Sequence, residues 1–356
     1  MSYQTIDKYL KRLLKDIFCG ISSNSPYKNN DFLHVLVNAA EHEDFTNNSA
    51  IRIGGPTGET VFSRLKDTDF DKIKCSFYSI LTHVFSGIKP FLRNRKVGLA
   101  FDTTDEPYYG KVEGLWIHHY QPVRGSTGCF RYITTSIVYN DRRFILGSLP
   151  VRVGADTVEL VMELIENAKK FVSIETTLFD RGFDSYELID SLQKAHVHYQ
   201  ILWKKNAWTT KEFKKMKRGK TKEIMKVRKY SKNKSGYKVK IRFIFIKRYK
   251  RYKKGRAYNW IFATNTRQKS QHFYVDKYKK RWGIETVFRV LDDIRIKTTT
   301  KNVIIRYFIN IFCCLLYNLW KFARLIGINL SFKNFVARIL SHGTAKILLQ
   351  KRIEET

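Results

Sequence analysis

Two short stretches decide the fold: KVGLAFD at 96–102 and SIETTLFD at 173–180. In the first stretch, large apolar residues alternate with small ones, which is typical of a buried β-strand. Each stretch ends on an aspartate, Asp102 in the first and Asp180 in the second. Because the ends of adjacent strands converge in a twisted sheet, these two carboxylates can meet in space although they are far apart in the sequence.

Further strands and helices surround these two stretches. We expect strands at 130–140, 143–151 and 196–203, and helices at 156–170 and 184–194. The order is then strand, strand, strand, helix, strand, helix, strand, which is the order of an RNase H-like domain. We therefore predict an α/β core, a mixed sheet flanked by helices, that occupies 91–203 and resumes at 266–325.

The charge of the chain points to a polyanionic partner. Its 356 residues include 66 Lys and Arg against 32 Asp and Glu, a net charge of +34, and 43% of the residues are hydrophobic. DNA, RNA and an anionic membrane surface all fit such a charge. A protein that merely coats RNA is usually short and poor in core residues, and this chain is neither. The five cysteines form no CxxC pair, so a zinc finger is not expected.

Helical domains are expected at both ends of the core. Apolar residues recur at three- and four-residue steps within 1–90, which predicts a helical domain that binds DNA or, equally, serves packing or dimerisation. Residues 326–356 are expected to form a helical tail. The longest uncharged apolar run, 307–320, is shorter than the roughly 20 residues of a membrane span. We expect that run to form a buried helix, and the protein to be cytoplasmic without contacting a membrane.

A strongly basic segment interrupts the core at 204–265. Residues 204–256 alone hold 24 Lys and Arg against two acids, a net charge of +22. Within it, Lys238, Lys240 and Arg242 alternate with apolar residues, which predicts a strand with one basic face. A β-rich insertion of this kind is suited to a phosphate backbone. A solvated charged hairpin without a partner is the alternative.

A long helix is predicted over 271–293. Tyr278, Arg281 and Glu285 lie three and four residues apart on it, so they share one face. On that face an arginine and a tyrosine hydroxyl beside a carboxylate are suited to contact a phosphate backbone. Considered alone, a glutamate on a helix such as Glu285 is usually a solvated charge. Asp105 and Glu106 are rivals of Asp102 for the role at the end of the first strand.

Three motifs in order resemble one enzyme family. The segments DTTDEPYYGK (102–111), LFDRGFDSYELIDSL (178–192) and YKKRWGIETVFR (278–289) resemble the three acidic motifs of prokaryotic insertion-sequence DDE transposases. The third matches most of the YREK signature of the insertion-sequence-four-like group, and YNLW (317–320) also fits that group. The resemblance spans about 96–320 and leaves the N-terminal 90 residues and the tail uncovered.

The resemblance implies an RNase H-like core with a β-rich insertion between the second aspartate and the glutamate. Asp102, Asp180 and Glu285 would be catalytic metal ligands for Mg²⁺, with Mn²⁺ as a substitute and two ions in the site. Tyr278 and Arg281 would contact the end of the transposon. The implied activity is metal-dependent cleavage at transposon ends, followed by strand transfer into target DNA. Two copies of the chain, a homodimer, would hold the double-stranded ends together at the prokaryotic nucleoid.

One position departs from the signature, because Asp292 stands where the group has lysine. We expect Arg289 or Arg295 to take over the phosphate contact. A non-catalytic DNA-binding protein derived from a decayed or repurposed transposase is therefore an alternative, and a structural RNA-binding protein is a second one. The group is also known for flipping a base onto an aromatic side chain, and we assign that role to Trp208.

Trp203 and Trp260 also lie in or beside the insertion. For these two side chains we expect packing in the core.

Overall fold

The computed structural model of this chain describes residues 3–18, 25–92, 95–139, 142–232, 235–247, 259–267 and 270–341. Its strands form one sheet of nine, in the order β2-β3-β1-β5-β6-β9-β8-β7, with β4 paired to β3. The strands are β1 Val97–Tyr108, β2 Ile117–His118, β3 Gly128–Val138, β4 Ile145–Val151, β5 Ile174–Phe179, β6 Tyr199–Leu202, β7 Thr221–Lys232, β8 Ser235–Ile246 and β9 Trp260–Thr264.

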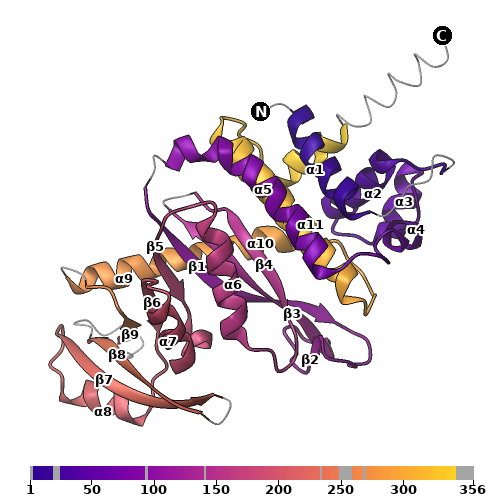
Figure 1. The fold of residues 1–356 in the computed structure, drawn as a ribbon. Coiled ribbons are helices and arrows are strands. Elements are labelled where there is room, and N and C mark those ends of the chain that lie inside the picture. The colour runs from indigo at the N-terminus through magenta and orange to yellow at the C-terminus, as the bar shows by residue number, and fades with distance from the viewer. Residues whose placement is uncertain are drawn as a thin grey trace.

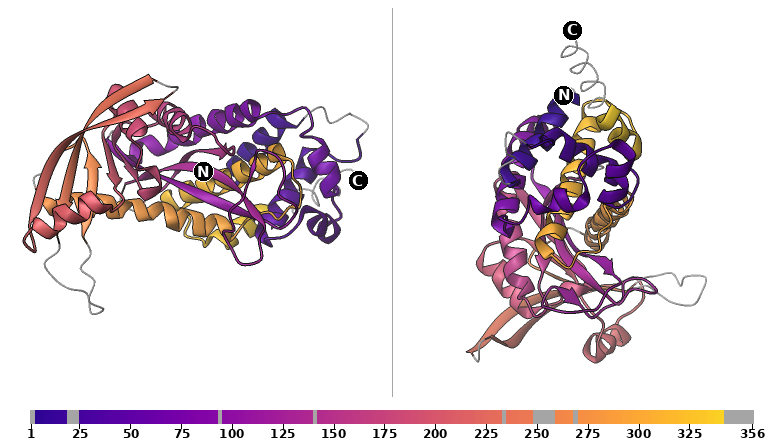
Figure 2. Two further views of the ribbon diagram at one scale, coloured as in Figure 1. Left: turned by 90° about the horizontal axis from the view of Figure 1, so that it is seen from below. Right: turned by 90° about the vertical axis from the view of Figure 1, so that its right-hand side faces the viewer.

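The helices cover the sheet on both faces (Figures 1 and 2). They are α1 Tyr3–Ile17, α2 Asn29–Glu41, α3 Thr46–Ile53, α4 Gly58–Ser63, α5 Phe70–Leu92, α6 Thr157–Lys169, α7 Tyr186–Lys194, α8 Ala207–Lys215, α9 Gln271–Lys279, α10 Gly283–Asp292 and α11 Val303–Leu325, with 3-10 turns η1 Arg181–Phe183 and η2 Lys280–Trp282. The mixed α/β architecture predicted from the sequence is confirmed, with β1, β5 and β6 parallel at its centre.

The position of α10 is set by a small apolar cluster. Ile284 packs against Ala100 of β1, Val138 of β3 and Leu178 of β5. Side chains alternate between the two faces of a strand, so the face that carries Ala100 and Leu178 also carries the residues two positions further along. Those residues are Asp102 and Asp180. The packing of Ile284 therefore brings Glu285 to the face of the sheet that holds both aspartates.

The basic segment extends the central sheet. Its strand β9 pairs with β6 of the core, and β8 and β7 follow outward as an antiparallel hairpin (Figure 2). The alternation predicted for this hairpin is present: Lys238 and Lys240 are exposed, whereas Val239 and Ile241 are buried. The sequence pattern did not predict β7 or α8.

The N-terminal helices pack on the α/β core through one continuous apolar cluster that includes α1, α2, α5 and α11. This region differs in charge from the rest of the chain. Residues 29–71, which contain α2, α3 and α4, hold eight acidic side chains and three basic ones, a net charge of −5. A contact between this part of the chain and DNA phosphates is therefore not favoured by charge.

The apolar helix α11 is a core element. By length and composition it is the one described helix that could cross a membrane, yet 78% of its most apolar window is buried within the protein. It is fixed to β4 by polar contacts: the Asn318 side chain bonds both backbone groups of Ile145, and the Tyr307 hydroxyl donates to the carbonyl of Ser148. Beyond it, residues 332–341 are helical, and the remaining part of the predicted tail, 342–356, lies outside the described residues.

The predicted helix 271–293 is broken, which corrects the expectation from the sequence. Helix α9 ends at Lys279, the turn η2 follows, and α10 begins at Gly283. The pattern of apolar residues does not reveal this break, because an α-helix, a 3-10 turn and a second α-helix follow one another without a gap. Across this turn Arg281 still shares a face with Tyr278 and Glu285, because its guanidinium lies over the Tyr278 ring and bonds the Glu285 carboxylate.

Candidate active site

Two aspartates occupy adjacent positions on neighbouring parallel strands. Phe101 of β1 pairs with Phe179 of β5, and the next residue on each strand is Asp102 or Asp180. The two phenylalanine rings stack with centroids 4.7 Å apart. Successive side chains point to opposite faces, so both aspartates project from the other face, where the strands are about 4.8 Å apart. The convergence predicted from the sequence is present in the fold.

Asp102 lies in a poorly solvated position. Its side chain is 16% exposed, and its Oδ1 accepts a hydrogen bond from the backbone N–H of Thr103 at 2.9 Å. Burial raises the pKa of Asp102 to about 6, and the negative charge of Asp180 adds to the rise, whereas Arg281 opposes it. Burial therefore makes the ionised form of Asp102 costly, and the ion pair with Arg281 offsets that cost only in part.

The rivals of Asp102 have structural partners. Asp105 accepts two hydrogen bonds from the guanidinium of Arg131, at 2.7 and 2.8 Å. Glu106 pairs with Arg306, which is buried and also donates to backbone carbonyls of the loop before α11. These ion pairs fix the outer half of β1 and leave Asp102 as the carboxylate that faces Asp180.

Asp180 is held by the turn that follows it. Its Oδ1 accepts the backbone N–H of Gly182 at 2.7 Å, which caps the 3-10 turn η1. A Cβ added at Gly182 would lie 3.0 Å from that same oxygen. The glycine of the Asp-Arg-Gly-Phe sequence thus lets the backbone approach the carboxylate closely, and a side chain there would require the carboxylate to shift slightly.

Arg281 links the third carboxylate to the first. Its Nη1 lies 2.7 Å from Oδ2 of Asp102, and its Nη2 lies 2.8 Å from Oε1 of Glu285. The Glu285 side chain is 54% exposed, so the cluster opens to solvent on its side. Among the described residues, no three acidic, histidine or cysteine side chains converge closely enough to hold a metal ion. The guanidinium, not a set of three carboxylates, is the centre of this arrangement.

The donor set nevertheless suits a hard divalent cation. Asp102, Asp180 and Glu285 offer carboxylate oxygens, the ligands that Mg²⁺ prefers. Asp102 is buried beside a second carboxylate, so an additional positive charge would stabilise its ionised form. In donor chemistry these residues suit the metal that the sequence led us to expect, whereas in this conformation the three carboxylates do not converge on one point.

Tyr278 and Arg281 are less accessible than the sequence suggested. Tyr278 is 1% exposed and packs against the rings of Trp260 and Phe262. Arg281 is 5% exposed. In this conformation neither side chain can reach a phosphate, so the prediction that they contact DNA requires them to move first.

The other predicted contact residues lie at the surface or near it. Arg289 is exposed one turn beyond Glu285 and has no ion-pair partner in the part of the chain that the structure describes. Lys238 and Lys240 are exposed on one face of the hairpin, whereas Arg242 is half-buried and pairs with Glu223.

The ring of Trp208 is packed within the insertion, whereas Trp282, a tryptophan to which the sequence analysis gave no role, is exposed. The ring of Trp208 packs edge-on against Phe243 and Phe245, and Nζ of Lys226 lies 3.8 Å from its centroid. Trp282 follows Arg281 directly and is 49% exposed, and our sequence reasoning overlooked it. Its position inside the RWGIE segment was the signal that could have identified it.

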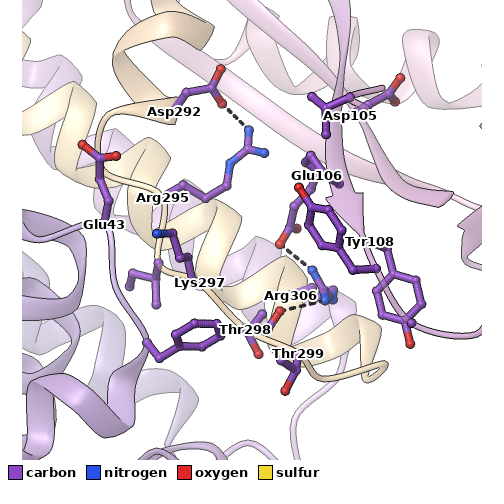
Figure 3. Close-up of a pocket in the computed structure, with 16 residues that line it drawn as sticks. Glu43, Asp105, Glu106, Tyr108, Asp292, Arg295, Lys297, Thr298, Thr299 and Arg306 are labelled. Carbon is purple, nitrogen blue, oxygen red and sulfur yellow. Dashed lines mark hydrogen bonds and ion pairs between the residues drawn. The ribbon is translucent and has the colours of Figure 1, made fainter. Parts of the chain in front are cut away.

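A cavity of about 620 Å³ lies at the far end of α10, lined by Asp292 but by none of the three carboxylates (Figure 3). Asp292 forms an ion pair with Arg295, so one of the two arginines expected to replace the missing lysine is engaged by Asp292 itself. Figure 3 also shows the pairing of Glu106 with Arg306. Because the acidic and basic groups here neutralise each other, the cavity has no clear preference for a phosphate.

The sequence profile of the transposase DDE domain matches residues 129–319, more than half of the chain. The chain belongs to the transposase DDE domain family. The matched stretch contains Asp180 and Glu285 and begins after Asp102. No curated protein sequence matches this transposase-family chain.

The fold of this transposase-family chain is similar to that of a solved transposase. The cryo-EM structure of the piggyBac transposase synaptic complex with hairpin DNA matches with a TM-score of 0.57 and 13% sequence identity. The match covers 99% of this chain and 79% of that one. At this identity the likeness is one of fold, and it is consistent with an RNase H-like transposase core.

Proposed function

We propose that this chain cuts DNA at the ends of its own mobile element and joins the freed ends to target DNA. The observation that carries the proposal is the pairing of Phe101 with Phe179, which sets Asp102 and Asp180 side by side on the face where α10 presents Glu285. Membership of the transposase DDE domain family supports this reading.

Asp102, Asp180 and Glu285 would hold divalent metal, Mg²⁺ or Mn²⁺, and two ions would suit an in-line displacement at phosphorus. When bound, the metal supplies an activated water or 3′-hydroxyl and stabilises the leaving oxygen. The protein's own part is to position these groups. Thr103 and Gly182 orient the two aspartates through backbone N–H groups. No covalent intermediate on a side chain is needed.

Basic side chains around this site would guide double-stranded DNA. Arg289 lies on the same helix as Glu285, and the β7–β8 hairpin presents Lys238, Lys240 and Arg242. Lys229 and Lys238 stand directly opposite each other on the two strands, which is destabilising unless an anion lies between them. A phosphate backbone is such an anion.

Trp282, instead of Trp208, would be the aromatic side chain that stacks on an unpaired base. Trp282 lies half-exposed beside Arg281, whereas the face of Trp208 is already covered by Lys226. Trp203 and Trp260 are buried, as expected of core residues. An exposed ring on the residue that follows Arg281 would be able to accept a base that leaves the duplex near the catalytic carboxylates.

We assign the chain to the insertion-sequence-four-like group on the residues Tyr278, Arg281 and Glu285, which match its YREK signature. Asp292 in place of lysine is the feature that favours the second candidate function, a transposase descendant that binds DNA without cutting it. In this protein Asp292 neutralises Arg295, which lowers the positive charge available at the far end of α10.

The test is a cleavage and binding assay on duplex DNA that carries the terminal sequence of the element encoding this chain. With Mg²⁺ or Mn²⁺ we expect cutting at the element end, which EDTA abolishes. Reverting Asp292→Lys is run in parallel. Tight binding of the end without cutting by either protein would reject the proposed activity and establish the binding-only function. Cutting by Asp292→Lys alone would identify this chain as an impaired copy of an active enzyme.

A further inference from the structure

Arg281 occupies the position where a cation is needed. It bridges Asp102 and Glu285 through its two Nη atoms, at 2.7 and 2.8 Å, and it is almost completely buried. Both oxygens of Asp102 are engaged, one by this guanidinium and the other by the backbone N–H of Thr103. A single guanidinium from within the chain therefore offsets part of the negative charge of these carboxylates.

A divalent ion at this site would compete with the guanidinium of Arg281 for the same carboxylate oxygens. Metal ligation needs lone pairs of Asp102 and Glu285 that now accept hydrogen bonds from Arg281. A positively charged guanidinium and a metal ion also repel each other at such short range. The metal can bind well only after Arg281 has moved away.

The structure also indicates what could move Arg281. Its Nε is buried and has no hydrogen-bond partner among the described residues, so one strong donor of the guanidinium is unused. Phosphate oxygens accept guanidinium groups in a two-pronged geometry, which would satisfy this donor as well. The exposed side of the cluster, at Glu285 and Trp282, is where a DNA strand would approach.

We propose that Arg281 is a positioning residue that holds the metal site closed until a DNA phosphate draws its guanidinium away. This inference rests on the proposed function. It makes metal binding and DNA binding mutually dependent: each ligand removes an obstacle to the other, and the coupling is equal in both directions. In free protein the guanidinium serves as the resident cation of the site.

The experiment measures Mn²⁺ binding to the full chain by the electron paramagnetic resonance signal of free Mn²⁺, without and with element-end duplex. A titration of the duplex alone corrects for ions held by DNA, and Asp180→Asn identifies binding at the catalytic carboxylates. For wild type, we expect the duplex to raise Mn²⁺ affinity about tenfold or more, within the usual range of coupling between sites.

For Arg281→Gln without DNA, we expect Mn²⁺ to bind about tenfold or more tightly than to wild type, with little further gain from the duplex. The matched control is Lys280→Gln, an exposed neighbour with the same change of charge, which should behave as wild type. An increase in affinity is diagnostic, because loss of a purely structural arginine would lower it. Should Arg281→Gln fail to fold, Arg281→Lys, which cannot span both carboxylates, should give an intermediate affinity.

Equal Mn²⁺ affinity of wild type with and without DNA, dependent on Asp180, would overturn the role of Arg281 and leave the proposed function standing. Absence of any Asp180-dependent Mn²⁺ binding, even with DNA, would instead contradict the proposed function itself. The two failures are therefore distinguishable in one set of titrations.

Discussion

At the scale of single residues, Gly182 determines where Asp180 sits. A Cβ there would lie 3.0 Å from the carboxylate oxygen that its own N–H supports, so Gly182→Ala should shift Asp180 by a few tenths of an ångström. Since a misplacement of about 1 Å costs roughly 100-fold in rate, we expect end cleavage to fall about tenfold. The matched control is Gly236→Ala, at a site with open space around it. An unchanged cleavage rate in Gly182→Ala, measured in single turnover, would contradict this view of Asp180.

Trp282 and Trp208 should respond differently to removal of the ring. Stacking on a base is worth about 1–3 kcal/mol, so Trp282→Ala should weaken binding of a duplex with an unpaired base near the element end by about tenfold. The melting temperature of the Trp282→Ala protein should stay close to that of wild type, because the ring of Trp282 is half-exposed. Trp208→Ala should instead lower the melting temperature, since its ring packs on Phe243 and Phe245. The reverse pattern would return the stacking role to Trp208.

At the scale of elements, local patterns predicted the strands well. Alternation of apolar residues marked β1, β3 and β5, and the positions of Asp102 and Asp180 followed from it. The 3-10 turn between α9 and α10 could not be read in this way, because the local pattern remains that of a helix. The partner of Arg281 could not be read either, because it is distant in sequence. Arg281 reaches across 179 positions to Asp102. For the same reason the sequence did not reveal that Arg281 lies in a buried ion pair, and its contact with a DNA phosphate stays a prediction.

The β7–β8 hairpin should contribute the salt dependence of DNA binding. Lys238 and Lys240 are exposed on one face, with no ion-pair partner in the described part of the chain. Removing both charges, as Lys238→Gln with Lys240→Gln, should lower the slope of log affinity against log salt by about two. Lys222→Gln is the control, because Lys222 is already paired with Glu212 at 2.6 Å. An unchanged slope in the double variant would show that the DNA does not contact this face of the β7–β8 hairpin.

At the scale of the whole molecule, charge governs association. Each copy carries +34, so two free copies repel each other, whereas DNA ends neutralise both. We therefore predict that the protein is monomeric in moderate salt and that two copies assemble on two element ends. Light scattering should report about 42.1 kDa without DNA and two protomers with it. A stable dimer without DNA would show that protein contacts alone drive assembly.

The N-terminal helices illustrate the limit of prediction at this scale. Their periodic apolar residues correctly indicated helices, but not their partner. The fold joins them to the core through one continuous apolar cluster, and residues 29–71 are net acidic. A short stretch of sequence does not show which distant residues its apolar side chains pack against. It also does not show on which surface of the fold its charged side chains lie.

The central claim is that Asp102, Asp180 and Glu285 act as one metal-dependent centre. The measurement that tests it most directly is the single-turnover rate of element-end cleavage for Asp102→Asn, for Asp180→Asn and for the double variant. Residues that act as a unit are strongly non-additive. We predict that each single variant loses at least about 1000-fold and that the double variant loses no more than the worse single one. A double variant whose loss of rate equals the product of the two single losses would contradict the account. Cleavage that survives either single substitution would contradict it as well.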